Sequence, residues 1–384
     1  VTGSGDSNTI EYLGIKVDGH VAGQDNYAAG VETYSARTNV HHVFIENNGD
    51  TSDTSYSPRG IHADHRTTAG FTFNDNIILG SHLGISLTFV GLSTAAPAKS
   101  KIYNNYIQHH RIPGTKAPYG IQLAKTRNVD IYNNQIVTDN GRGIMCDGFG
   151  QNVERGTDKN NIYNNRIDVE YRESATSGAY VENNLYGIRD RYSSGENHFH
   201  NNTIMVNNGI NKSGTISTGV FIGSDGQDAK MIDLEVKDNV IIADHVNGTA
   251  SALYYGYSDQ LTVTGNTYIA DAFSDEEYNF GRSGGTSIIP QFTETNNNRI
   301  SASNYTPAKV TGLALRKFFS NYVLTWDDNA EAQTLEYVVY RDGSPLDIST
   351  RGGTFYIDTV SGTHSYTVAA KNLNGNIGAQ SNAV

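Results

Sequence analysis

The sequence of 384 residues contains little cysteine, proline or methionine, and it lacks long apolar runs. It contains one cysteine, Cys146, with seven prolines and three methionines. A single cysteine excludes an intramolecular disulfide and therefore a small scaffold held by disulfides. No uninterrupted apolar run approaches the length that crosses a bilayer, so we predict no membrane partner.

Positive charge is also scarce. Lysine and arginine number 28 against 40 aspartate and glutamate residues, which gives a formal net charge of −12. Nucleic acids and anionic membrane surfaces attract basic proteins, so this balance argues against nucleic acid as a partner.

Turn-forming and strand-forming residues are abundant instead. There are 40 glycines and 24 tyrosines, with many asparagines and threonines. Strong helix formers are sparse, so the composition predicts an all-β chain.

Asparagine recurs with a period near thirty residues over the first three hundred positions. It precedes a β-rich stretch in NNYI (104–107), NNQI (133–136), NNRI (164–167), NNTI (201–204) and DNVI (238–241), with weaker copies on both sides. With the second asparagine as the marker, the repeat falls at Asn48, Asn76, Asn105, Asn134, Asn165, Asn202, Asn239, Asn266 and Asn298. We expect each marker to adopt a left-handed backbone at a sharp turn and to stack its amide on the next coil.

A glycine followed by an aliphatic residue recurs in phase with this marker. It occurs in AGVETYS (29–35), RGIHADH (59–65), LGISLTF (83–89), YGIQLAK (119–125), RGIMCDG (142–148), YGIRDRY (186–192) and TGVFIGS (218–224). Two markers that alternate in this way predict a coil of short strands joined by turns, with a column of aliphatic side chains as its core.

These repeats resemble the right-handed parallel β-helix of the pectate-lyase-like superfamily over residues 1–305, and we expect about nine coils. A β-sandwich or a propeller is the structural alternative, but a propeller blade needs about forty residues and four strands. The resemblance implies a secreted or cell-surface bacterial protein with a polysaccharide substrate, and we expect it to be a monomer.

Residues 306–384 differ in character. Alternating strands are predicted within 313–329, 336–346 and 364–378, separated by turns. Their Leu-x-Trp, Tyr-x-x-Tyr-Arg-Asp-Gly and Tyr-x-Val patterns resemble a fibronectin type III module, a small β-sandwich. We place the linker at Thr306 and Pro307 and expect no catalysis from this part.

Strand alternation assigns side chains to the two sides of the coil. The third position after each glycine points inward and reads Thr33, Ala63, Leu87, Leu123, Cys146, Asp190 and Ile222. The outward positions are polar and charged in the middle coils, where Gln122, Asp147 and Arg189 are expected to lie along one line. Substrate contacts are predicted for His62, Asp64, His65, Arg66, Gln122, Arg127, Arg142, His109 and Arg111. Cys146 is expected to be a buried, inert thiol.

Loop length indicates which side binds. The segments 109–118, 148–159 and 169–184 are long for a regular solenoid, and long loops in such folds mark the binding face. We expect them to form the walls of a cleft around residues 119–192, with His109 in the first of them.

The resemblance implies β-elimination on a uronate-containing glycan, because many β-helices of this kind act in that way. Arg189 and Arg191 are candidates to neutralise the uronate carboxylate. Lys125 is the candidate base, on the argument that a positive, partly dry cleft lowers the pKa of a lysine. His62, His65 and Tyr192 are rivals for that role. No motif of the familiar β-helix enzymes is matched, so the subfamily stays open.

Two other classes of function remain open. A glycoside hydrolase needs two carboxylates about 5–9 Å apart, for which Asp147 and Asp190 are candidates. A non-catalytic glycan-binding or surface protein would also suit the tyrosine content. No cofactor is certain, although Asp64 and Asp147 together are candidates to hold Ca²⁺.

Asp190 is the one charged residue in the inward column. A buried carboxylate needs hydrogen-bonding partners. Either Asp190 points inward and supports Arg189 and Arg191 from beneath, or a bulge turns it outward as a catalytic acid.

Overall fold

The computed structural model describes most of the chain, and none of the described residues lies in a helix. The described residues are 2–3, 8–17, 29–35, 37–47, 58–64, 70–91, 98–109, 118–139, 141–148, 157–170, 184–191, 193, 195–208, 216–223, 232–245, 249–255, 260–270, 272–274, 291–300, 306–329, 334–346, 353–372 and 374–384. They include no helix that could cross a membrane. They divide into two compact units, Val1–Arg299 and Ile300–Val384.

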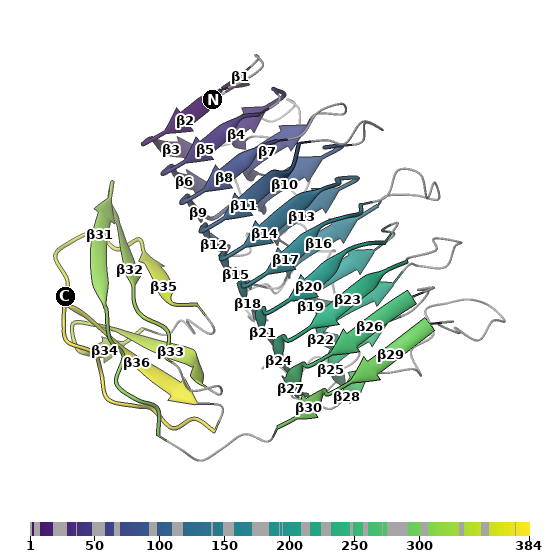
Figure 1. The fold of residues 1–384 in the computed structure, drawn as a ribbon. Helices are drawn as coiled ribbons and strands as arrows, with labels where there is room; N and C mark the ends of the chain where they lie inside the picture. Colours follow the sequence, from purple (N-terminus) through teal and green to yellow (C-terminus); the bar gives the residue numbers. More distant parts are fainter. Residues whose placement is uncertain are drawn as a thin grey trace. The chain divides into compact units, whose positions relative to one another are not determined.

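The first unit consists of three parallel sheets of ten strands each (Figure 1). Sheet A contains β1 (Thr2–Gly3), β4 (Ala29–Thr33), β7 (Arg59–Asp64), β10 (Leu83–Thr88), β13 (Tyr119–Ala124), β16 (Arg142–Asp147), β19 (Asn184–Arg191), β22 (Ile216–Gly223), β25 (Thr249–Tyr255) and β28 (Ala272–Ser274).

Sheet B contains β2 (Thr9–Glu11), β5 (Asn39–His41), β8 (Thr72–Asn74), β11 (Ser100–Tyr103), β14 (Val129–Tyr132), β17 (Asn161–Tyr163), β20 (His198–His200), β23 (Leu234–Lys237), β26 (Gln260–Thr264) and β29 (Gln291–Thr295). Sheet C contains β3 (Gly14–Val17), β6 (Phe44–Asn47), β9 (Ile77–Leu79), β12 (Tyr106–His109), β15 (Gln135–Asp139), β18 (Arg166–Glu170), β21 (Thr203–Asn208), β24 (Val240–His245), β27 (Thr267–Ile269) and β30 (Asn298–Arg299).

Each turn of the chain supplies one strand to each sheet, so the described strands form ten coils, one more than predicted. The predicted right-handed parallel β-helix is confirmed. The interior is a set of apolar columns in register, such as Ile107, Ile136, Ile167, Ile204 and Ile241 in sheet C, all of which are buried. Because every interior side chain stacks on its equivalent one coil away, the core is continuous along the helix.

The asparagine repeat forms a buried amide ladder at the turn between sheets B and C. Asn134 Nδ2 donates to Asn165 Oδ1 at 2.9 Å, and the same bond repeats from Asn76 to Asn297. The preceding residue, Asn133 or Asn164 for example, carries the left-handed backbone. We predicted that one asparagine adopts the left-handed backbone and also stacks its amide on the next coil. This prediction is wrong, because two neighbouring residues share these roles.

The ends of this repeat also differ from the prediction. The last ladder residue is Asn297, while the predicted marker Asn298 begins β30. The first coils continue the turn without asparagine, with His42 in the left-handed region and Val43 bonded to Asn76 Oδ1. Asn48 lies outside the described residues.

The glycine repeat has a packing cause. A Cβ built on Gly143 would lie 2.6 Å from the carbonyl oxygen of Gly187 and closer still to Cγ2 of Ile167. The isoleucine column of sheet C therefore packs directly against the glycine column of sheet A, and only glycine leaves room for it.

The second unit contains two antiparallel three-stranded sheets. One is made of β31 (Ala314–Phe318), β32 (Asn321–Thr325) and β35 (Phe355–Asp358). The other is made of β33 (Thr334–Arg341), β34 (Ser344–Pro345) and β36 (Tyr366–Asn372). Its own apolar core includes Trp326, Tyr337 and Tyr366, so the predicted small β-sandwich is confirmed.

Candidate functional site

The outer face of sheet A carries three columns of side chains, defined by the pairing of its strands. The first contains Leu83, Tyr119, Arg142, Tyr186 and Thr218. The second contains His62, Ser86, Gln122, Met145, Arg189, Phe221 and Tyr254. The third contains Asp64, Thr88, Ala124, Asp147, Arg191 and Gly223. The prediction that Gln122, Asp147 and Arg189 share one line is wrong, because Asp147 belongs to the third column.

Two arginines of this face are packed between aromatic rings. The Arg142 guanidinium carbon lies 4.7 Å from the centre of the Tyr119 ring, and its Nη1 donates a hydrogen bond to the Tyr119 hydroxyl. The Arg189 guanidinium carbon lies 4.7 Å from the Tyr186 ring and 5.2 Å from the Phe221 ring. Both arginines are buried. Cation–π contacts gain strength when water is excluded, so these two side chains are held firmly in place.

The rings belong to a cluster of their own. Tyr186, Phe221 and Tyr254 pack together outside the core of the coil, and the last two rings stack at 5.2 Å. Sequence reasoning missed this cluster. The alternation of the strands carried its signal, because Phe221 and Tyr254 occupy the outward position of Arg189 in the next two coils.

A third arginine is more accessible and pairs with a carboxylate. Arg191 Nη2 donates to Asp147 Oδ2 at 3.0 Å, with 24% of the Arg191 side chain exposed against 3% for Asp147. Asp147 therefore fixes a guanidinium that still reaches solvent.

Lys125 lies one coil from Asp147 and two coils from Arg191. Its backbone nitrogen donates to the carbonyl oxygen of Asp147 at 2.8 Å, and its left-handed backbone follows the end of β13. Its Nζ is 5.4 Å from the centre of the Phe89 ring, and the residue is half-buried. We call Lys125, Asp147 and Arg191 the edge cluster, because they lie where β13, β16 and β19 end.

Asp190 points into the coil, between Cys146 and Ile222. It is fully buried, and its Oδ2 accepts hydrogen bonds from Ser193 Oγ at 3.0 Å and from Asn197 Nδ2 at 3.1 Å. Burial raises the pKa of Asp190 to about 7, and the charge of Asp147 acts in the same direction, while the two hydrogen bonds oppose the rise. Cys146 is also fully buried, and burial raises the pKa of its thiol well above the usual range, as expected of an inert cysteine.

The inward position of Asp190 removes it from direct chemistry on a bound glycan. Asp147 lies on the opposite side of the sheet, because it pairs in register with Arg191 and not with Asp190. The two carboxylates therefore cannot flank one glycosidic bond as the hydrolase hypothesis requires.

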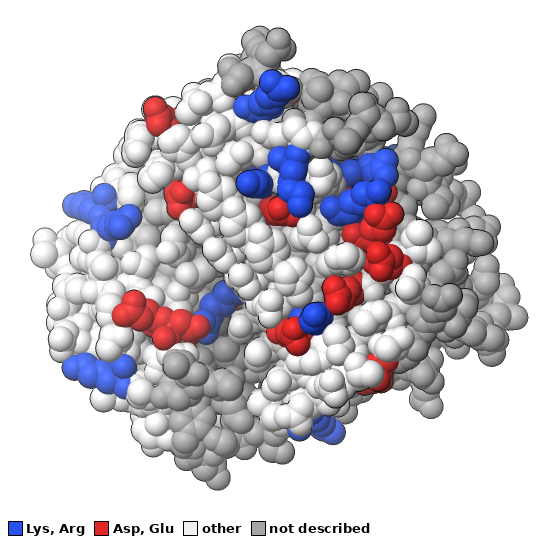
Figure 2. All heavy atoms as spheres, viewed as in Figure 1, with Lys and Arg blue, Asp and Glu red and all other residues white. Residues whose placement is uncertain are grey.

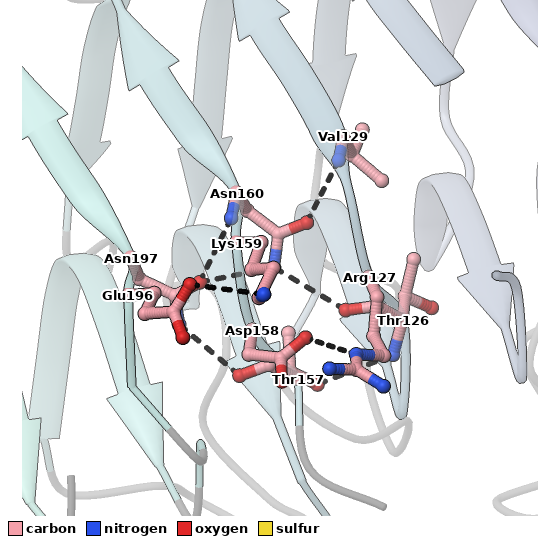
Figure 3. A network of polar contacts seen from close by, with 9 residues as sticks. All are labelled: Thr126, Arg127, Val129, Thr157, Asp158, Lys159, Asn160, Glu196 and Asn197. Carbon is pink, nitrogen blue, oxygen red and sulfur yellow. Dashed lines mark hydrogen bonds and ion pairs between the residues drawn. The ribbon is translucent and has the colours of Figure 1, made fainter. Parts of the chain in front are cut away.

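A polar network at the turn between sheets A and B supports Asp190 (Figure 3). Asn160 Nδ2 donates to Asn197 Oδ1 at 3.0 Å, and Asn197 in turn donates to Asp190. On the outside of this turn Arg127 pairs with Asp158, and Lys159 Nζ lies 3.2 Å from Glu196. Arg127, a predicted substrate contact, is therefore engaged within the protein at a turn away from the face of sheet A.

The remaining predicted contacts are placed as follows. His62 is buried in the second column, and burial, with the nearby charge of Arg59, lowers its pKa to about 3, so its imidazole is neutral. Gln122 is half-buried and its Oε1 accepts a hydrogen bond from Ser86 at 3.3 Å. Asp64 is half-buried in the third column.

The prediction for His109 is wrong. It is not a loop residue but the last residue of β12, and it is fully buried in register with Thr138. Its position alternates with Gln108 and matches that of the interior Ile107, so it faces the inside of the coil, where no polymer reaches. Tyr192, His65, Arg66 and Arg111 lie outside the described residues, as do most of the three long loops.

The residues proposed for calcium do not meet. Asp64 on β7 and Asp147 on β16 are separated by β10 and β13, which places them about 14 Å apart at the usual strand spacing. Among the described residues no group of three or more histidine, cysteine, aspartate or glutamate side chains gathers as a metal site.

No protein-family model and no curated protein sequence matches the chain. Among solved structures it is similar to the Dettilon tailspike protein, at 14% identity over 96% of this chain and 80% of that one, with a TM-score of 0.27. A mutant tailspike of E. coli bacteriophage HK620 in complex with a pentasaccharide is 9% identical over 94% of this chain and 87% of that one, with a TM-score of 0.32. A spore cortex lytic enzyme of Clostridium perfringens, SleM, is 17% identical, but the match spans 20% of this chain and 27% of the enzyme, with a TM-score of 0.19.

Proposed function

We propose that this protein binds a uronate-containing polysaccharide along the outer face of sheet A and cleaves it by β-elimination. The observation that carries the proposal is the edge cluster. It sets an accessible guanidinium, fixed by a buried carboxylate, two coils away from a half-buried lysine.

β-Elimination requires the carboxylate of the uronic acid to be neutralised, so that the proton on the neighbouring carbon becomes acidic. Arg191 is suited to this task, because a guanidinium recognises a carboxylate with two parallel hydrogen bonds. Its pairing with Asp147 restricts the rotation of its side chain, so less freedom is lost when substrate binds.

Lys125 is the group assigned to proton abstraction. Adjacent coils lie about 4.8 Å apart, so the strands that precede Lys125 and carry Arg191, with β16 between them, are roughly 10 Å apart. Two long side chains can approach a single sugar across that gap. The amine would take the proton as the bond to the leaving oxygen breaks, and would then be the acid that returns a proton to that oxygen.

Arg142 and Arg189 have a supporting role in this scheme. Both are buried between rings, so we assign them to the positive potential of the face and to its rigidity, not to direct contact with the reacting sugar. Charges in a site of low polarity act on a bound anion more strongly than charges in water.

The test is a survey of the purified 384-residue chain against uronate polymers, namely alginate, polygalacturonate and glucuronan. β-Elimination leaves a carbon–carbon double bond, so the ultraviolet absorbance of the product should rise together with the number of reducing ends. New reducing ends without that absorbance would indicate hydrolysis. Binding with neither signal would indicate a non-catalytic glycan-binding protein, and the proposed reaction would be wrong.

Two further parts of the proposal concern the setting of this reaction. We propose that the protein works outside the cell or at its surface, where polysaccharides of this kind are found. We also propose that the second unit is a fibronectin type III-like module without catalytic function. Its two antiparallel sheets and the burial of Trp326 and Tyr337 in its core support that assignment.

A further inference from the structure

The outer face of sheet B carries a regular stack of aromatic rings that the proposed reaction does not use. Tyr103, Tyr132, Tyr163 and His200 occupy equivalent positions on β11, β14, β17 and β20. Their ring centres are 4.9, 5.0 and 5.0 Å apart, and the ring planes are within 7° of parallel. We call these four residues the tyrosine ladder.

The ladder presents ring edges and hydroxyl groups to solvent, not ring faces. All four residues are half-buried, and the stacking covers the faces between them. None of the three tyrosine hydroxyls bonds to another described residue. Partial burial raises the pKa of Tyr132 and of Tyr163, so their hydroxyls stay neutral hydrogen-bond donors.

Amide groups extend this row of hydroxyls to a wider strip. Asn133 and Asn164 follow Tyr132 and Tyr163 directly, are exposed, and are held by the left-handed backbone of the turn. On the other side Asn161 donates to Asp130, whose charge is also balanced by Lys99 at 2.8 Å. The phenol hydroxyl and the asparagine amide therefore recur from coil to coil, whereas the position of Asn161 is occupied by Asp130 and by Lys101 in the two preceding coils.

The charge of this strip limits what can bind there. Figure 2 shows uncharged surface through the middle of the face that is also toward the viewer in Figure 1, with lysine, arginine and acidic side chains around it. A polyanion would find no continuous positive charge along the ladder, because the exposed Lys101 is followed in the next two coils by Asp130 and Asn161. An uncharged ligand rich in hydroxyl groups suits the strip better.

We propose that the tyrosine ladder is a second glycan-binding site, for an uncharged, extended β-1,4-linked polysaccharide that lies across the strands of sheet B. In such a polymer the sugar rings are flat and follow one another along the chain axis. The length of one sugar along that axis is close to the distance between neighbouring ring centres of the ladder. Each sugar then meets one phenol hydroxyl and one asparagine amide. The site is on a different sheet from the edge cluster, so it would anchor the protein to a polymer without taking part in cleavage.

The test removes the hydroxyls and keeps the stack. The triple variant Tyr103→Phe, Tyr132→Phe, Tyr163→Phe retains three aromatic rings, and Tyr340→Phe on the second unit is the matched control. Binding is measured by co-sedimentation with microcrystalline cellulose and with chitin, which share the β-1,4-linked repeat but differ in their side groups. Wild type and control should sediment with at least one polymer, and the triple variant should bind about 10- to 100-fold more weakly, because three hydrogen bonds are lost.

Two results would overturn the proposal: wild type that sediments with neither polymer, or a triple variant that sediments as wild type does. Thermal unfolding monitors the fold of the variant. If that variant unfolds, tetranitromethane nitration of wild type gives the answer, since bound cellohexaose should slow the nitration of Tyr132 and Tyr163, and an unchanged rate would contradict the site. Cleavage of uronate oligosaccharides should be the same in the triple variant and in wild type, so failure here is distinguishable from failure of the proposed lyase.

Discussion

The outer faces of sheets A and B are built from the same coils but repeat in different ways. On sheet B, Tyr103, Tyr132 and Tyr163 place the same side chain at the same position in successive coils. On sheet A the corresponding step from Gln122 to Met145 to Arg189 changes chemistry at every coil. The stacking of coils therefore does not by itself decide which outward side chains repeat.

This difference separates side chains that stack on an identical neighbour in the next coil from side chains that need a different partner. Stacking identical groups satisfies the repeat at every coil, as the asparagine ladder does at the turn between sheets B and C. The face of sheet A departs from repetition between β13 and β22, where it needs cation–π contacts and the Arg191–Asp147 pair to accommodate its charges.

The largest effect is expected where the repeat is strictest. Asn134→Ala removes an amide that donates to Asn165, Ile102 and Tyr132 and accepts two bonds from Asn105. Buried groups left without partners cost about 1–3 kcal/mol each, so the free energy of unfolding should fall by about 5 kcal/mol. Urea unfolding measures it. Asn133→Ala, at the exposed neighbour, is the control, and an equal loss in both would show that the turn and not the ladder provides the stability.

The buried carboxylate of the inward column should make stability depend on pH. The pKa of Asp190 is raised to about 7, so its neutral form stabilises the fold at low pH, and that contribution is lost as the pH rises from about 4 through 7. With a rise of about three pKa units, the difference between wild type and Asp190→Asn should change by about 4 kcal/mol over that window.

The measurement is urea unfolding at closely spaced pH values. Asparagine can still accept hydrogen bonds from Ser193 and Asn197, so the variant should fold and should show the flatter curve. Parallel curves for the two proteins would mean that Asp190 stays ionised in the folded state.

A smaller loss of stability is expected when the packing of sheet C against sheet A is disturbed. Gly143→Ala would force a methyl group against Ile167 and the Gly187 carbonyl, and overpacking of this kind costs about 1–3 kcal/mol. Gly343→Ala in the second unit, where a Cβ meets nothing within 4 Å, is a contrast that isolates backbone strain from packing. Thermal unfolding of both variants checks the expectation, which is contradicted if Gly143→Ala is the milder of the two.

The smallest effect on stability is expected at the exposed arginine. Arg191→Met removes one ion pair of a partly exposed side chain, whereas Arg189→Met removes a cation–π contact between two buried rings. We expect a loss of about 1 kcal/mol or less at Arg191 and about 2 kcal/mol at Arg189. Chemical unfolding distinguishes them, and a reversed order would show that the two arginines have been assigned the wrong roles.

Much of the fold was predictable because the coils of a solenoid repeat, and the residues that each coil needs repeat in the sequence with the same period. The spacing of asparagine and glycine predicted the coils. Alternation after Gly187 placed Asp190 in the inward column but left a bulge as the alternative, and the structure shows the inward position. The same alternation would have placed His109 inside, but the histidine pair suggested a loop. The sequence did not show that Asn133 adopts the left-handed backbone while Asn134 forms the amide ladder. Both residues are asparagine, and only the backbone angle distinguishes them.

The candidate site was less predictable, because its contacts depend on which side chains meet across coils. The sequence made both Arg191, in the outward row, and Arg127, just past a predicted strand, candidates for contact with the substrate. The structure pairs Arg127 with Asp158 at a turn and Arg191 with Asp147 on the face of sheet A. Those pairings depend on the register of each turn, which the spacing of the repeats does not specify.

The most direct test of the central claim compares Arg191→Ala with Arg127→Ala on the uronate polymer that wild type cleaves. Each variant removes one paired arginine, on strand β19 and at the turn after β13 respectively. The initial rate of product absorbance should fall about 100- to 1,000-fold for Arg191→Ala, as for loss of one charge-stabilising donor, and should stay near the wild-type value for Arg127→Ala. Near-normal turnover of Arg191→Ala, with the fold intact, would contradict the assignment of the site to the edge cluster on sheet A.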